Sequence, residues 1–316
     1  MNNVTVIVPI YNIEHYVMGM LRDLHNQTYA SATFLLIDDG STDRTGLKIK
    51  NFLKIIQDSR FQYYFKEHGG VSDARNFGLD LTTSKYVIFL DGDDRICPTL
   101  VESYVFSIEN SESDIEFFKL EKYKIERGNV IFPEESQLVY PDYKSDEILR
   151  QKNILNMLVK SEIYGHSVAY ISRTCLWERI RFPKQYYLLE DLYALFNLIG
   201  EHRQIVGKVN NISKCYYISR PDSVIHSMSW SDLYETIVVQ KKIRDDFLSD
   251  KNHIKRMNAL ILRTRLGHLI KAKKELNYNQ KKRVMRLIVK ESMTMNLTLR
   301  TRIFILLSCL LRTKES

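Results

Sequence analysis

The sequence lacks any uninterrupted apolar run of about 18 residues, the length that a membrane-spanning helix needs. It also lacks the charged leader and long apolar core of a secretory signal, because its first apolar run, Val4 to Ile10, is short and contains Pro9. Its four cysteines have no paired spacing, which argues against a disulfide framework or a zinc site and fits a reducing compartment. We therefore expect a cytoplasmic protein without spanning helices.

Acidic residues are scarce near the end of the chain, where seventeen Lys and Arg accompany three acids from Lys251 onward. This segment carries a net charge of +14, which leaves −6 for residues 1–250. Its stretch from Leu297 to Leu311 is apolar and flanked by arginines, which suits a helix lying in an anionic membrane surface. The alternative is a helix that packs on the main domain and exposes its Lys and Arg to solvent.

Short apolar runs alternate with stretches of helical periodicity over the first 230 residues. The predicted strands cover 4–10, 34–37, 61–65, 87–90, 114–125, 130–132 and 216–219, and the main helices cover 14–27, 42–56, 71–81, 98–111, 140–161 and 192–199. This alternation predicts an α/β fold with right-handed crossovers and a mostly parallel sheet covered by helices on both faces. Residues 231–316 are predicted to form a helical, basic C-terminal region.

Three carboxylates follow the strand predicted over 87–90, in the run Asp91-Gly92-Asp93-Asp94. Carboxylates this close repel one another unless a cation lies between them. Hard oxygen ligands around a flexible glycine suit Mg2+ or Mn2+, with coordination positions left for a diphosphate. The simpler alternative, an acidic cap on the helix predicted from Pro98, explains one Asp and not three.

The carboxyl ends of parallel strands meet at one edge of a sheet, and ligands of open α/β sheets bind beyond that edge. Tyr11, Asp39, Gly70 and Asp91 each follow a predicted strand or open the next helix. We therefore expect all four residues to lie along the same edge.

Five motifs occur in one order within the first 230 residues, and each alone is weak evidence. They are Val-Ile-Val-Pro-Ile-Tyr-Asn at 6–12, Asp-Asp-Gly-Ser-Thr-Asp at 38–43, Gly-Gly-Val-Ser-Asp-Ala-Arg-Asn-Phe-Gly at 69–78, Phe-Leu-Asp-Gly-Asp-Asp at 89–94 and Glu-Asp-Leu-Tyr at 190–193. Together they resemble the family 2 glycosyltransferases of GT-A fold.

The resemblance implies an inverting transfer of a sugar, a hexose or N-acetylhexosamine, from a uridine diphosphate (UDP) sugar to an acceptor hydroxyl. The Gln-x-x-Arg-Trp run of processive polymer synthases is absent, so a single addition is expected. By analogy, the acceptor would be a lipid-linked glycan in bacterial capsule, exopolysaccharide or wall-polymer synthesis. The basic tail would then hold the enzyme peripherally at the inner face of the cell membrane.

Within this resemblance, the first two motifs would bind the nucleotide. Tyr11 would offer its ring to the base, in a loop shaped by Pro9 and Asn12, and Asp39 would accept a hydrogen bond from uracil. The alternatives are that Tyr11 is an aromatic of the core and that Asp39 only forms a turn.

The third motif would approach the phosphates and the nucleotide. Gly69 and Gly70 would let the backbone come close to the ligand before a helix N-terminus. Arg75, one turn into that helix, would pair with the nucleotide. The alternative for Arg75 is a surface ion pair with Asp39 or Asp73.

The fourth motif would bind the divalent cation, Mn2+ or Mg2+. Asp93 resembles the family's metal ligand, Asp91 would contact the ribose or the metal, and Asp94 would touch the sugar, with Gly92 between them. His226 stands where many relatives carry a further metal or phosphate ligand, although a lone histidine is often structural.

Asp191 occupies the place of the family's catalytic base. An inverting displacement needs a carboxylate that takes the proton as the acceptor hydroxyl attacks the anomeric carbon opposite the leaving diphosphate. Glu190 would orient or tune it, since adjacent acids push their pKa values apart. The alternative for either acid is an N-terminal cap on the helix from Leu192.

Two other functions would fit parts of the sequence. A sugar nucleotidyltransferase would need a glycine-rich loop with Arg after the first strand, whereas Tyr11, Asn12 and Ile13 stand there. A nucleic-acid-binding protein would need more base-stacking side chains than the tail's two aromatics, Tyr278 and Phe304. A nucleic-acid partner is therefore not expected, and the oligomeric state is left open.

Overall fold

The computed structural model describes residues 3–126, 129–131, 137–138, 148–163, 165–219 and 230–271, together with 282, 286 and 288–290. The chain divides into two compact units, Met1–Gln185 with Glu190–Ser223, and Tyr186–Leu189 with Val224–Ser316. The predictions for His226 and for the stretch from Leu297 to Leu311 lie outside the described residues. Within the described part of the chain, no helix is both long enough and apolar enough to cross a bilayer.

Four parallel strands form the first half of the sheet, in the order β3-β2-β1-β4. They are β1 (Val4–Ile10), β2 (Ala32–Asp38), β3 (Phe61–Phe65) and β4 (Tyr86–Phe89). The chain steps outward from β1 to β3 and then crosses back to β4 on the other side of β1. The strand order therefore reverses beside β1, where open α/β sheets place their ligands.

The second half of the sheet is mixed rather than parallel. β10 (Tyr170–Arg173) runs antiparallel to both β4 and β6 (Ile115–Glu126), and β11 (Val206–Ser219) runs parallel to β6. The short strand β5 (Arg95–Ile96) pairs antiparallel with β11. Beside β6 and β11 lie three short strands, β7 (Asn129–Ile131), β8 (Gln137–Leu138) and β9 (Ile148–Arg150). Strands β4 and β6 are therefore not neighbours in the sheet, because β10 lies between them and runs antiparallel to both.

The helices of the first unit are α1 (Val17–His25), α2 (Thr45–Ile56), α3 (Val71–Leu81), α4 (Leu100–Ser111), α5 (Gln151–Val159) and α6 (Glu190–Glu201). Two short 3-10 helices cover Ser167–Ala169 and Thr174–Trp177. The second unit contains α8 (Trp230–Phe247) and α9 (Lys251–Lys271). The helix predicted over 140–161 is confirmed for α5, whereas Ile148–Arg150 is a strand paired with β11. Residues 140–147 lie outside the described residues.

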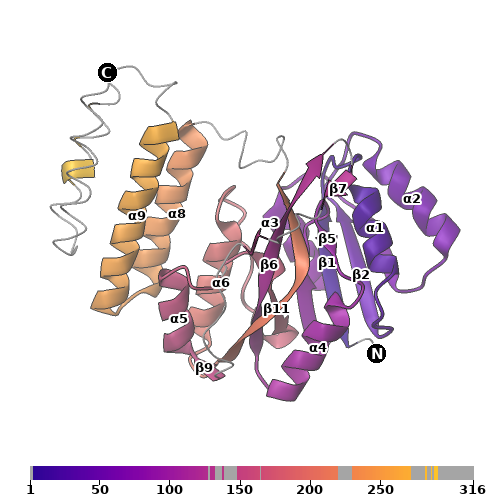
Figure 1. Ribbon diagram of the computed structural model, residues 1–316, viewed down its shortest axis with the longest axis horizontal. Coiled ribbons are helices and arrows are strands. Elements are labelled where there is room, and N and C mark those ends of the chain that lie inside the picture. The colour runs from indigo at the N-terminus through magenta and orange to yellow at the C-terminus, as the bar shows by residue number, and fades with distance from the viewer. Residues whose placement is uncertain are drawn as a thin grey trace. The chain divides into compact units, whose positions relative to one another are not determined.

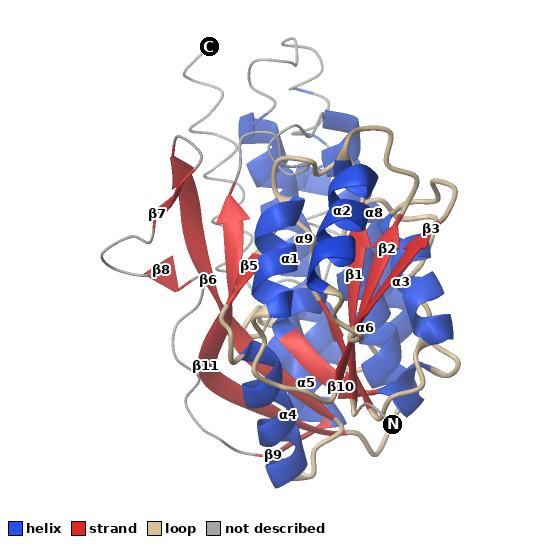
Figure 2. Cartoon of the chain, turned by 90° about the vertical axis from the view of Figure 1, so that its right-hand side faces the viewer, coloured by secondary structure: helices blue, strands red, loops and turns tan. Residues whose placement is uncertain are grey.

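The side chains of β1 alternate between two layers of helices, as the two-residue period of a strand requires. Val4, Val6 and Val8 pack in one core with α1 and α4. Ile7 points to the other face, where a Cβ atom on Gly78 of α3 would lie 2.5 Å from its Cγ2. Figures 1 and 2 show the same arrangement, with α1 and α2 on one face of the parallel strands and α3 on the other. Because α3 follows the end of β3 after a short loop, it begins at the carboxyl edge of the sheet and runs antiparallel to the strands.

Candidate active site

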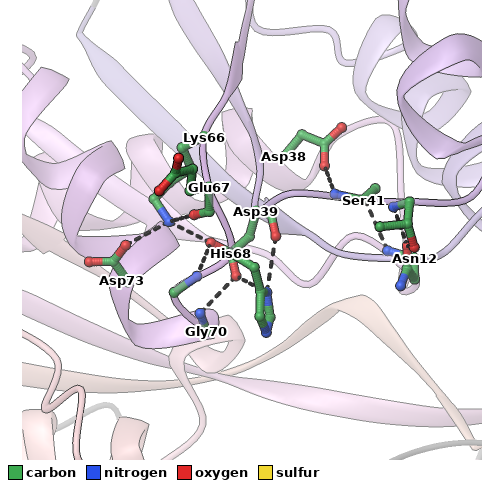
Figure 3. A network of polar contacts seen from close by, with 11 residues as sticks. Asn12, Asp38, Asp39, Ser41, Lys66, Glu67, His68, Gly70 and Asp73 are labelled. Carbon is green, nitrogen blue, oxygen red and sulfur yellow. Dashed lines mark hydrogen bonds and ion pairs between the residues drawn. The ribbon is translucent and has the colours of Figure 1, made fainter.

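The loops after β1 and β2 are fixed to each other at the carboxyl edge of the sheet. Asn12, in the left-handed region with φ of 48°, accepts hydrogen bonds at Oδ1 from the backbone N–H of Thr42 at 2.8 Å and of Asp43 at 3.3 Å. Its own backbone N–H donates to Ser41 Oγ at 3.0 Å (Figure 3). The side chain of Asn12 thus orders two loops, and Pro9 lies in β1 opposite Ile37.

The adjacent acids Asp38 and Asp39 are both buried but have different partners. Asp38 accepts from the backbone N–H of Ser41 at 2.9 Å and from the Tyr63 hydroxyl at 2.7 Å. Burial and this contact raise the pKa of Tyr63. Asp38 therefore stabilises the turn after β2, whereas Asp39 faces the loop between β3 and α3.

Asp39 holds the loop between β3 and α3 with both carboxylate oxygens (Figure 3). Oδ1 accepts from Lys66 Nζ at 2.6 Å and from the backbone N–H of Gly69 at 3.0 Å. Oδ2 accepts from the backbone N–H of Gly70 at 2.8 Å, and His68 Nδ1 lies 2.8 Å from it. Gly70 has a φ of 88°, a conformation that glycine adopts without steric cost.

Tyr11 lies outside the core and stacks on His68. The two ring centroids are 4.2 Å apart and the planes are inclined by 23°. Tyr11 is 44% exposed, and the His68 side chain is 54% exposed. The carboxyl edge of β1 and β2 therefore combines a partly exposed aromatic pair with a buried carboxylate.

Arg75 joins two acidic motifs that are far apart in the sequence. Its guanidinium, with only 4% of the side chain exposed, donates from Nη2 to Asp91 Oδ1 at 3.0 Å and from Nη1 to Glu190 Oε1 at 2.8 Å. It also lies over the Phe182 ring, 5.2 Å from the centroid. The alternative of a surface ion pair is therefore wrong for this residue. The motifs around residues 91 and 190 therefore meet at the buried guanidinium of Arg75.

The other polar residues of α3 fix the segment that precedes Glu190. Ser72 Oγ donates to the carbonyl oxygen of Pro183 at 3.0 Å. Asn76 forms a reciprocal pair with the backbone of Phe182, donating at 2.9 Å and accepting at 2.8 Å. Asp73 pairs with Lys66 at 2.6 Å and with Lys184. These positioning roles were not expected from the sequence, although Ser72, Arg75, Asn76 and Leu79 share one helical face and are all buried.

Glu190 and Asp191 open α6 and have opposite pKa shifts. Burial, and then the charge of Asp191, raise the pKa of Glu190 to about 7, although Arg75 opposes this. Burial would also raise the pKa of Asp191, but the hydrogen bond and charge of His166 and the charge of Arg75 lower it overall. The pair thus contains one acid that readily holds a proton and one that stays ionised.

His166 is a site residue that sequence reasoning missed. Its Nδ1 lies 3.3 Å from Asp191 Oδ2, and Asp191 Oδ1 accepts from the backbone N–H of Leu192 at 2.7 Å. Burial is the largest single effect and lowers the pKa of His166. The hydrogen bond and charge of Asp191, together with the charges of Asp91 and Glu190, outweigh it, so the net shift of the pKa is upward. A Cβ atom on Gly165 would collide with Leu192, so glycine there lets the His166 segment pack closely on α6. A Gly-His pair is too common in sequences to reveal this contact.

The acidic run after β4 lies beside Arg75. Asp91 is half-buried, with 39% of its side chain exposed, and its carbonyl oxygen accepts from the backbone N–H of Asp94 at 3.1 Å. A Cβ atom on Gly92 would lie 2.7 Å from Ile13 Cδ1 and 3.2 Å from the carbonyl oxygen of Pro9, so a larger residue there would force these neighbours to shift. Asp93 is partly exposed and Asp94 is buried. No group of three or more His, Cys, Asp or Glu side chains within the described ranges is arranged to hold a metal by itself.

Sequence comparison identifies relatives across most of the chain. The model of glycosyl transferase family 2 matches residues 5–176. The glycosyltransferase GlyG of Streptococcus pneumoniae is 25% identical over 285 residues, which cover 88% of this chain and 90% of GlyG. The Escherichia coli protein WfgD, named UDP-Glc:alpha-D-GlcNAc-diphosphoundecaprenol beta-1,3-glucosyltransferase, is 28% identical over 251 residues, 78% of this chain and 87% of WfgD. A longer relative, GlyA of S. pneumoniae, is 39% identical over 114 residues, and the chain spans only 16% of its length.

Solved structures share the fold of the chain at low sequence identity. Staphylococcus aureus TarS 1–349 in complex with UDP-GlcNAc has a TM-score of 0.67 at 18% identity and covers 93% of this chain and 81% of its own. The mannosyltransferase PcManGT of Pyrobaculum calidifontis, in complex with GDP-Man and Mn2+, has a TM-score of 0.59 at 15% identity. The match covers 98% of this chain and 86% of the PcManGT chain. The expected fold is therefore confirmed by comparison with proteins that bind nucleotide sugars.

Proposed function

This chain belongs to glycosyl transferase family 2, and we propose that it transfers a single sugar from a UDP-sugar, with inversion, to a hydroxyl of a lipid-linked glycan. The observation that carries the proposal is the position of Arg75, which brings the strand-end acid Asp91 and the acidic pair at Glu190 to one place. A donor diphosphate and an acceptor-side carboxylate need such a shared site. The reversal of strand order beside β1 supports a ligand site at this edge of the sheet.

The donor would bind across the loops that follow β1, β2 and β3. The base would use the Tyr11 ring and the Asp39 carboxylate, and the backbone around Gly70 would approach the ligand. TarS binds UDP-GlcNAc, and the name of WfgD specifies UDP-Glc. Both support a uridine nucleotide as the carrier, and a hexose or N-acetylhexosamine as the sugar.

The carboxylates of Asp93 and Asp91 would hold a divalent cation, Mn2+ or Mg2+. Their chemistry fits, because both are oxygen ligands at the edge of the site, and Arg75 bonds to one oxygen of Asp91. Two carboxylates leave the remaining coordination positions to phosphate oxygens of the donor and to water, a usual arrangement for Mg2+. A cation bound there would neutralise charge on the leaving diphosphate. The Mn2+ in the PcManGT structure supports this choice.

Asp191 would act as the general base toward the acceptor hydroxyl. Its lowered pKa keeps the carboxylate ionised at neutral pH, and its hydrogen bonds to His166 and Leu192 fix its orientation. Glu190, whose pKa is raised to about 7, would hold Arg75 in place through their ion pair. Attack from the side opposite the diphosphate inverts the anomeric carbon, so an α-linked donor would give a β linkage.

Removal of the cation should abolish turnover, and the same assay identifies the donor. We expect one sugar from a panel of UDP-sugars to be hydrolysed slowly with Mn2+, and this release of UDP to stop with a chelator. Asp93→Ala should lower the rate by roughly 10²-fold, since a metal supplies several kcal/mol of transition-state stabilisation. Asp80→Asn, which changes an exposed acid of α3, is the matched control. No UDP release from any donor, and no metal-dependent binding of UDP, would contradict the proposed function.

The acceptor would be presented at a membrane surface, as the diphosphoundecaprenol in the name of WfgD suggests. Residues from Lys251 onward carry a net charge of +14, which attracts an anionic surface. We expect the full chain to sediment with anionic vesicles at low salt and to be released at high salt. Replacing Arg300, Arg302 and Arg312 by Gln should weaken this binding. Equal sedimentation with neutral vesicles would contradict an electrostatic attachment.

A further inference from the structure

We propose that His68 occupies the nucleobase subsite of the unliganded enzyme and must leave it before the donor can bind. His68 would then set the affinity of the site for the nucleotide. This inference rests on the proposed UDP-sugar function, in which the base uses Tyr11 and Asp39. Three observations on the loop between β3 and α3 support it.

The first observation is that donors already surround the Asp39 carboxylate. Three of them hydrogen-bond to it: Lys66 Nζ and the Gly69 N–H at Oδ1, and the Gly70 N–H at Oδ2. The fourth, His68 Nδ1, bonds to the Asp39 carbonyl oxygen and lies 2.8 Å from Oδ2, where it covers the remaining acceptor position. The carboxylate is also buried, with 3% of its side chain exposed. A base N–H can therefore approach Asp39 only if one of these four donors moves away.

The second observation is that only His68 among these four donors is free to move away. The N–H groups of Gly69 and Gly70 belong to the backbone before α3, and the Gly70 carbonyl oxygen accepts the helical bond of Ala74 at 3.1 Å. Lys66 is mostly buried and is also bound to Asp73 at 2.6 Å. The His68 side chain is half-exposed and can rotate into solvent without breaking the helix start.

The third observation is that His68 already makes both contacts assigned to the base. Its ring stacks on Tyr11 at 4.2 Å, which leaves no space for a second ring between them. Its Nδ1 must carry a proton to face Asp39, because an ionised carboxylate only accepts hydrogen bonds. A planar ring with one N–H donor is also what uracil presents. The imidazole is therefore a placeholder that mimics the base.

The backbone around Gly40 is shaped to keep His68 in this position. Gly40 has a φ of 77°, and a Cβ atom there would lie 2.8 Å from the backbone nitrogen of His68. His68 Nδ1 also lies 3.0 Å from the carbonyl oxygen of Asp39. Figure 3 shows the imidazole below Asp39, beside Gly70. The turn after β2 and the loop after β3 thus approach each other directly at the placeholder.

His68→Ala should bind UDP more tightly than the native enzyme. The native enzyme must break the contact between His68 and Asp39 when UDP binds, whereas the variant has no such contact to break. The net free energy of one hydrogen bond corresponds to a gain of about 2- to 10-fold in the affinity of the variant for UDP. Isothermal titration of UDP with Mn2+ measures this directly, with His15→Ala as the control for an exposed histidine. If His68 were instead a platform on which the base stacks, the variant would bind UDP more weakly. Weaker or unchanged binding overturns the inference.

A measurement on the native protein makes the test independent of the variant. Stacking on Tyr11 places the imidazole protons of His68 in the ring current of tyrosine, so their NMR signals should shift toward those of an exposed histidine as UDP is added. Signals that keep their position at saturating UDP overturn the inference. Failure of the native enzyme to bind any UDP would instead refute the proposed function, so the two failures are distinguishable.

Discussion

Asp191→Asn should lower kcat for sugar transfer by about 10²- to 10⁴-fold, the usual contribution of a general base. The amide keeps the size of the carboxylate but cannot accept the proton of the acceptor hydroxyl. Because the proposed function assigns Asp191 to the acceptor hydroxyl and not to the nucleotide, we expect the affinity for UDP to stay unchanged. Single-turnover transfer at saturating donor measures the first quantity, and titration with UDP measures the second.

The surroundings of Asp191 make the substitution conservative in structure. Both of its oxygens face donors, the His166 ring and the Leu192 N–H, and the imidazole can change its tautomer to match an amide. Asp80→Asn makes the same chemical change on the exposed side of α3 and should leave kcat near that of the native enzyme. Native kcat in Asp191→Asn would exclude this residue as the base, and Glu190 would then be the acid to test.

Much of the first half of the fold could be predicted, because its signals are local. The strand predicted over 61–65 and the helix predicted over 71–81 coincide with β3 and α3. By contrast, Arg95–Ile96 and Tyr170–Arg173 were not predicted as strands. Each is only a few residues long, and each pairs with strands distant in the sequence. Such pairings depend on tertiary contacts, which periodicity does not encode.

The candidate site was predicted in its motifs but not in its contacts. Asp39 and Asp73, the acids named in the alternative for Arg75, both pair with Lys66, whereas Arg75 bonds to Asp91 and Glu190. The helical spacing of α3 explains why Arg75 and Asp73 have different partners. Arg75 shares a buried face with Ser72 and Asn76, while Asp73 lies on another face and pairs with Lys66. The contacts of His68 with Tyr11 and of His166 with Asp191 were missed because a single histidine has no pattern around it.

The burial of Arg75 leads to the second large effect. Arg75→Met should reduce the free energy of unfolding by about 3 kcal/mol or more, since removing one partner of a buried ion pair leaves its charges uncompensated. Arg75→Lys should recover only part of the loss, because one ammonium group does not reproduce a planar fork that bonds to both Asp91 and Glu190. Urea unfolding of the three proteins measures the differences. Lys242→Met, which breaks an exposed pair with Asp246, is the control and should change stability much less.

The loss in Arg75→Met should depend on pH through Glu190. Arg75 lowers the pKa of Glu190 in the folded protein, so its removal moves that pKa further above about 7. An acid whose pKa is raised by folding contributes stability below its unfolded pKa and loses it as pH rises through the folded value. The deficit of Arg75→Met should therefore be larger at pH 8 than at pH 5, and it should shrink when Glu190→Gln is added. An equal deficit at both pH values, with or without Glu190→Gln, would show that Arg75 stabilises the fold through Asp91 or through packing on Phe182 rather than by compensating Glu190.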